Sequence, residues 1–122
     1  MILTGRLLVN ELTERLTTAQ PIVMGGTDPT AEELQKRTGE MGFVLVKFTE
    51  TRGGTELGFR LDREASDTSA ADFSQGRGTV HVEGNLILNG DHVRCFADID
   101  LATLKGTGRL ALEEKATVAA DL

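Results

Sequence analysis

The sequence predicts a mainly β protein: an antiparallel β-sandwich or small barrel of about six or seven strands, with two short helices in the N-terminal third. Three observations support this fold class. Apolar and polar residues alternate from about residue 42 onward. Glycine-containing turns separate the alternating runs, and one clear helix-capping signal precedes them. The 122 residues fit a single β-rich domain, 1–122, that is long enough to bury a core.

The first twenty residues predict a strand and then a helix. Residues 2–9, ILTGRLLV, form an apolar run that we expect to be an opening strand. In the next segment, NELTERLTTA, Leu12 and Leu16 are four residues apart and Asn10 is a candidate cap, so we expect a short helix. The apolar segment PIVMGG follows and is broken by its two glycines.

The segment TDPTAEELQKRTGE carries the clearest helix signal. Thr30 and Glu33 have the spacing of a capping box, and Gly39 suits a left-handed helix end. Only Ala31 and Leu34 are apolar in this segment, so the helix is expected on the surface, as a connector or as a lid.

Two runs rich in β-forming residues predict a first hairpin, FVLVKF at 43–48 and LGFRL at 57–61. We expect Thr51 to face Gly54 across the turn. The pairs that follow from this register are Phe48 with Leu57, Val46 with Phe59, and Val44 with Leu61. A two-residue shift is disfavoured because it would put Lys47 opposite Arg60, and like charges directly opposite each other are unfavourable.

The segment DREASDTSAADFSQGRG, residues 62–78, predicts a long polar loop. Loops of this length are uncommon unless they are functional or mobile. Phe73 is its only large apolar residue, and it either anchors the loop on the core or contacts a partner.

The strongest prediction is a second hairpin around Asn89-Gly90, because this dipeptide suits a type I′ turn between alternating runs. The register places Cys95 on the apolar face, where a thiol is unreactive. The apolar-face pairs are Leu88 with Asp91, Leu86 with Val93, Gly84 with Cys95, Val82 with Ala97, and Val80 with Ile99. A further strand, KGTGRLALEE, is expected to point Leu110 and Leu112 inward, and TVAADL is a candidate edge strand.

The same register brings charged residues together on the opposite face of this hairpin. His81 faces Asp98, and the other pairs are Glu83 with Phe96, Asn85 with Arg94, Ile87 with His92, and Thr79 with Asp100. Such a face is most simply the solvated side of an antiparallel sheet. A contact surface is the second interpretation, favoured by Phe96, and a pocket inside a closed barrel is the third.

The pocket interpretation predicts a ligand-binding protein or an enzyme of isomerase, cyclase or hydrolase type. His81 would act as the general base and Asp98 would orient it, while Glu83 or Arg94 would stabilise charge. His81, Glu83 and Asp98 also make a generic set of possible metal ligands, but we expect no metal and no cofactor. No phosphate-binding, nucleophile-elbow or zinc-protease motif is present.

Composition limits the partners. The 13 basic residues are scattered among 19 acidic ones and the net charge is −6, so we expect neither nucleic acid nor an anionic membrane as a partner. No apolar run is long enough to span a bilayer. The single cysteine excludes an internal disulfide, and we expect a cytoplasmic location.

We therefore favour a structural or protein-interaction module, acting as a subunit of a homo-oligomer or a larger assembly. Its partners would be copies of itself or other protein subunits; a small-molecule ligand belongs to the alternative. The expected interface residues are Phe96, Ile87 and Phe73. Uncovered sheet edges could also be completed by strand addition from another chain.

Overall fold

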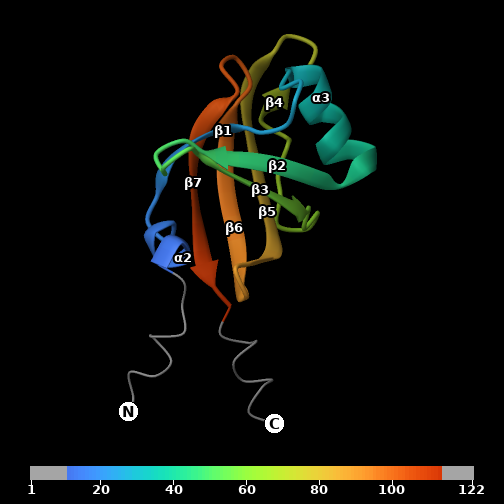
Figure 1. Ribbon diagram of the computed structural model, residues 1–122. Coiled ribbons are helices and arrows are strands. Elements are labelled where there is room, and N and C mark those ends of the chain that lie inside the picture. The colour runs from blue at the N-terminus through green and yellow to red at the C-terminus, as the bar shows by residue number, and fades with distance from the viewer. Residues whose placement is uncertain (1–10, 114–122) are drawn as a thin grey trace, which may run out of the picture.

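In the computed structural model, which describes residues 11–113, one antiparallel sheet is curled into a half-barrel (Figure 1). The strand order is β3-β2-β1-β7-β6-β5-β4. The strands are β1 Gln20–Met24, β2 Phe43–Phe48, β3 Thr55–Arg60, β4 Ala71–Asp72, β5 Arg77–Leu88, β6 Asp91–Asp100 and β7 Lys105–Leu112. The helical elements are α2 Glu11–Arg15, α3 Ala31–Lys36 and the π-helical turn η1 Arg37–Met41. The predicted fold class is confirmed in its barrel-like form, because a single sheet curls on itself.

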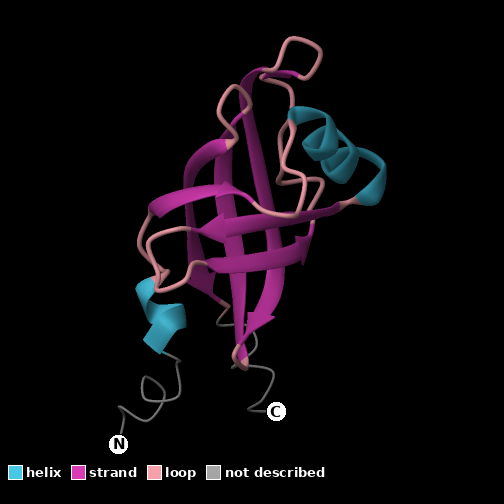
Figure 2. Ribbon diagram, turned by 45° about the horizontal axis from the view of Figure 1, so that its top comes forward, coloured by secondary structure: helices cyan, strands magenta, loops and turns pink. Residues whose placement is uncertain are grey.

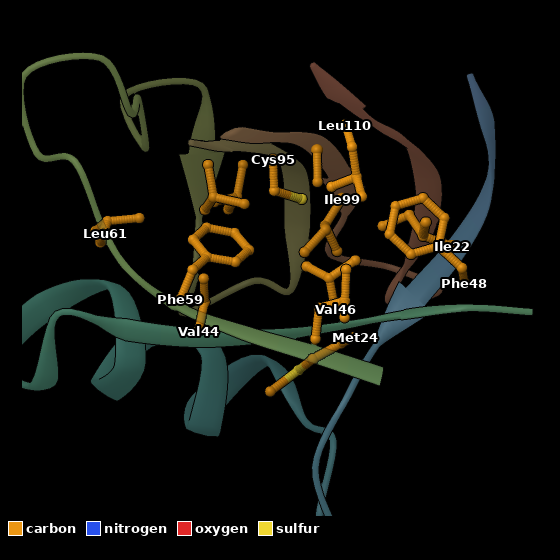
Figure 3. Close-up of a cluster of buried hydrophobic side chains, with 14 of the residues drawn as sticks. Ile22, Met24, Val44, Val46, Phe48, Phe59, Leu61, Cys95, Ile99 and Leu110 are labelled. Carbon is orange, nitrogen blue, oxygen red and sulfur yellow. The ribbon is translucent and has the colours of Figure 1, made fainter. Parts of the chain in front are cut away.

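The core lies between the two halves of this curled sheet. β1, β2 and β3 cross over the longer strands β5, β6 and β7 (Figures 1 and 2), and their inward side chains meet in one apolar cluster (Figure 3). Phe48 and Phe59 are its largest buried side chains, and Cys95 is fully buried among its aliphatic residues. The prediction that Cys95 lies on the apolar face is therefore confirmed.

The predicted helix before residue 20 is present as α2. Leu16, the residue that directly follows α2, is fully buried in the core. The Leu110 amide donates to the Leu16 carbonyl over 2.8 Å, so the segment that leaves α2 is fixed to β7. Among the described residues, no helix is long and apolar enough to cross a membrane.

The start of α3 is as predicted, but its end is not. The Thr30 side chain accepts from the Glu33 amide at 3.0 Å, as a cap should. The helical backbone does not end at Gly39, as predicted. It continues through η1 and ends at Gly42, which takes the left-handed conformation with φ of 63°. Arg63 explains the extension, since its guanidinium donates to the Thr38 and Gly39 carbonyls at the end of the helix.

The first hairpin is present as β2 and β3, but the predicted register is wrong by two residues. Val46 pairs with Leu57, Val44 with Phe59, and Phe48 with Thr55. The connection is longer than the predicted turn because Gly53 and Gly54 both take positive φ, at 73° and 78°. The observed register also places Lys47 opposite Glu56, a favourable pair of opposite charges.

The second hairpin, β5 with β6, has the predicted register at every pair from Thr79 with Asp100 to Leu88 with Asp91. Asn89 and Gly90 have φ of 50° and 87°, as the type I′ turn requires. β7 continues the sheet as predicted; Leu110 is fully buried, whereas Leu112 lies at the strand end and is 44% exposed.

Some predicted elements have a different outcome. The apolar residues of PIVMGG belong to β1, Gln20–Met24, a strand in the middle of the sheet that was not predicted; the two glycines follow it. The predicted loop 62–78 contains β4, which pairs with the first residues of β5. The predicted strands at 2–9 and 117–122 lie outside the described residues.

Candidate functional site: a charged network on the outer face of β5 and β6

The predicted polar face is held together by His81, which lies between two carboxylates. Its Nδ1 is 2.7 Å from Asp98 Oδ1, and its Nε2 is 2.6 Å from Glu83 Oε2. β5 supplies His81 and Glu83, two residues apart on one face, and β6 supplies Asp98 opposite. The structure therefore brings together three of the four residues predicted under the enzyme alternative in one hydrogen-bonded chain.

Arg94 is the fourth predicted residue, and it extends the network away from His81. Its guanidinium donates to Glu83 Oε1 at 2.9 and 3.1 Å, to Asn85 Oδ1 at 3.1 Å and to Asp62 Oδ2 at 2.7 Å. The ring of Phe96 lies beside the same arginine, 5.8 Å from its guanidinium carbon, and the guanidinium of Arg109 lies 4.3 Å from the ring centroid on a neighbouring strand. Phe96 is consequently covered in part by two arginines.

Residues 62–67 fasten to the outer edge of β5, which the sequence analysis did not foresee. The Asp62 amide donates to the Glu83 carbonyl at 2.8 Å, and the Ser66 hydroxyl accepts from the Glu83 amide at 3.0 Å. Asp67 and His81 exchange two backbone hydrogen bonds, at 2.8 and 2.9 Å. These contacts join parts of the chain that are far apart in sequence, and no local pattern indicates them.

The electrostatics of the network follow from these contacts. Partial burial opposes protonation of His81, but the hydrogen bonds and charges of Glu83 and Asp98 outweigh it and raise the pKa of the imidazole. Burial likewise acts to raise the pKa of Glu83, but His81 and Arg94 outweigh it and lower that pKa. Arg94 also lowers the pKa of Asp62 through its hydrogen bond. When His81 is protonated, the network therefore sets the cations His81 and Arg94 against the carboxylates of Glu83, Asp98 and Asp62.

The half-barrel closes where the end of β3 meets β5. A Cβ added to Gly84 would lie 2.2 Å from the Arg60 carbonyl oxygen and 2.4 Å from the Phe59 ring, so only glycine permits this approach. Beside the closure is an open cleft of about 420 Å³. It is lined by Arg60, Leu61, Asp62, Asn85 and Arg94.

Beyond this closure, the described part of the chain leaves the edge of β5 uncovered. The backbone N–H and C=O groups of His81 and Glu83 point away from β6 and are hydrogen-bonded by residues 62–67. Every second residue of a strand turns its backbone groups to the same edge, so those of Asn85 and Ile87 point there too. Within residues 11–113, Asn85 and Ile87 have no backbone partner there. Ile87 is 61% exposed. The last predicted contact residue, Phe73, is partly buried and packs against the core, so it anchors its loop.

The chemistry of the network is limited by its saturation. A general base needs a free lone pair, yet both ring nitrogens of His81 are engaged by carboxylate oxygens. Metal binding meets the same obstacle, because the imidazole separates the two carboxylates; the described part of the chain holds no group of three ligands placed for a metal ion. Burial raises the pKa of the Cys95 thiol to about 12, which makes it a poor nucleophile.

Fold and site together define a barrel-like antiparallel β protein with a saturated charged network on the outer face of β5 and β6. Comparison with protein families gives the same class. Residues 28–121 match the family described as Core binding factor beta subunit, and the chain belongs to this family. A search of curated proteins found no match. The prediction of a protein-interaction module is confirmed at this level.

Proposed function

We propose that the chain is a non-catalytic subunit of a hetero-assembly that binds a different protein along the cleft between β3 and β5. The observation that carries the proposal is the backbone edge of β5 at Asn85 and Ile87, beside the cleft, which no other described residue covers. An unprotected strand edge is a template for pairing with an added strand. Family membership as a subunit supports the same conclusion.

The side chains around this edge indicate the kind of segment that fits. Ile87 offers an exposed apolar contact, and Arg60 is an exposed cation with no side-chain partner among residues 11–113. An extended segment with an apolar residue opposite Ile87 and a carboxylate near Arg60 would satisfy both. The edge lacks the lysine or proline that commonly protects such strands.

A photo-crosslinking residue placed at Ile87 tests the proposal in the cell that produces the protein. The control is the same residue at Gln35, an exposed position on α3, which lies at the end of the molecule opposite the β5–β6 turn (Figures 1 and 2). We expect one discrete crosslinked protein from Ile87 and none from Gln35. The purified partner should then bind the wild-type chain and lose affinity for Ile87→Asp. Equal labelling from both positions, or no crosslink from Ile87, would contradict the proposal.

The homo-oligomer predicted from the sequence is the second arrangement, since two uncovered β5 edges could pair antiparallel across a twofold axis. Light scattering of the purified chain at two concentrations distinguishes the hetero-assembly from the homo-oligomer. A monomer supports the hetero-assembly, and a dimer that Ile87→Asp dissociates supports self-pairing. We also propose the cytoplasmic location predicted above, which a single, buried cysteine supports.

A further inference from the structure

We propose that a proton held by His81 between Glu83 and Asp98 locks residues 62–67 onto β5 and thereby sets the shape of the cleft beside Arg60. The part of this inference that concerns the cleft rests on the proposed function; the lock itself does not. It assigns the charged network a regulatory role rather than a catalytic one.

The geometry requires the extra proton. A neutral imidazole has one N–H, and an ionised carboxylate can only accept. Both ring nitrogens of His81 lie within 2.7 Å of a carboxylate oxygen, so both contacts are hydrogen bonds only when both nitrogens carry hydrogen. Placing the proton on Glu83 instead is disfavoured because Arg94 donates to the other oxygen of that carboxylate. Asp98 is 56% exposed and keeps its charge solvated.

The charges that face His81 reinforce this state. On β5 and β6 they are Glu83 and Asp98, and the segment along the edge adds Asp67, whose charge also acts on the imidazole. Arg94 is the nearest permanent cation, and it is shared between Glu83 and Asp62. On β7, which packs against β6, Thr107 faces Asp98; the cations Lys105 and Arg109 face Asp100 and Phe96. Without its proton, His81 would no longer offset the charges of Glu83, Asp98 and Asp67, and Arg94 would be the cation left to Glu83.

Loss of the proton has a defined path to the cleft. One ring nitrogen would then present a lone pair to a carboxylate, so either Asp98 or Glu83 would lose its hydrogen bond to the imidazole. Glu83 positions Arg94, and Arg94 holds Asp62 at 2.7 Å; both line the cleft. The backbone of Glu83 and His81 holds Asp62, Ser66 and Asp67 as well. These backbone hydrogen bonds do not involve the imidazole proton, so deprotonation would act on the side-chain contact between Arg94 and Asp62 and would change the cleft that these two residues line.

Nuclear magnetic resonance of the isolated chain tests the lock. We expect the His81 imidazole to titrate above the ordinary histidine value of about 6.5. The Asp62 and Asp67 amide signals should shift with the same midpoint, and this shift should be lost in His81→Gln. In Glu83→Gln the His81 midpoint should move down. A His81 midpoint at or below the ordinary value, or amide signals in residues 62–67 that ignore it, would overturn the lock.

Affinity measured against pH then tests the link to the cleft, using the partner found by crosslinking at Ile87. We expect wild-type affinity to change across the His81 midpoint and His81→Gln affinity to stay level across the same range. A wild-type affinity that stays level would overturn the link to the cleft while the proposed function stands. Absence of a crosslinked partner would overturn the proposed function and, with it, the link between His81 protonation and the cleft. The His81 titration tests the effect of the proton on residues 62–67 independently of any partner.

Discussion

Substitution of Gly84 by alanine should destabilise the protein, although alanine normally improves a strand position. The added Cβ would lie 2.2 Å from the Arg60 carbonyl oxygen and 2.4 Å from Phe59 Cδ2. Real Cβ atoms essentially never approach within 3.0 Å, so one partner has to move by nearly 1 Å. Phe59 is 2% exposed within the core, and the Arg60 carbonyl is backbone, so neither yields easily.

The expected cost is that of overpacking, about 2 kcal/mol. For a chain of this length, 1 kcal/mol corresponds to about 4 °C in Tm, so we expect Tm to fall by about 8 °C. Thermal and urea unfolding followed by circular dichroism measure both quantities. The matched control is Gly39→Ala, because Gly39 lies in a helical turn, has no atom within 4 Å of its added Cβ and should gain about 0.5–1 kcal/mol. If Gly84→Ala were as stable as wild type, the closure of β3 on β5 described above would be wrong.

Three further predictions concern the network and the core. Arg94→Met should lower the free energy of unfolding by about 1 kcal/mol, because it strands the partly buried Glu83 carboxylate. Arg52→Met, at an exposed loop position, should change it little, and equal effects of the two variants in urea unfolding would contradict this. The raised pKa of His81 stabilises the fold fully below its unfolded value of about 6.5, and this stability is lost as pH rises through the folded value. His81→Gln should remove that decline, and an unchanged pH profile would refute the assignment. Cys95, with its pKa raised to about 12, should react with a thiol reagent only after unfolding, and fast labelling of the native protein would count against its burial.

Local signals in the sequence were sufficient for the β5–β6 hairpin. The Asn89-Gly90 turn fixes the register, and the alternation of apolar residues fixes the same register independently. The pairing of His81 with Asp98 therefore followed from the sequence alone. The cap of α3 at Thr30 was predictable for the same reason, since the donor and acceptor lie within three residues.

Contacts between distant segments were not predictable in this way. The β2–β3 register depends on Gly53 and Gly54, which both take positive φ. The segment TRGG does not by itself indicate that both glycines adopt this conformation. β1 has a proline, Pro21, at its second position and is followed by two glycines, so its place in the sheet depends on neighbours from both β2 and β7. Asp62 reaches Arg94 only because the barrel closes at Gly84. The network was therefore recognised in part, whereas the cleft beside it was missed.

The most direct test of the central claim is amide hydrogen exchange of the chain, free and bound to its crosslinked partner, measured by mass spectrometry. Strand addition along β5 predicts that protection on binding is concentrated in peptides containing Asn85–Leu88 and the facing end of β3 at Arg60, and that peptides from α3 are unchanged. Protection confined to α3, or to the outer face of β7, would contradict the account and place the interface elsewhere on the molecule.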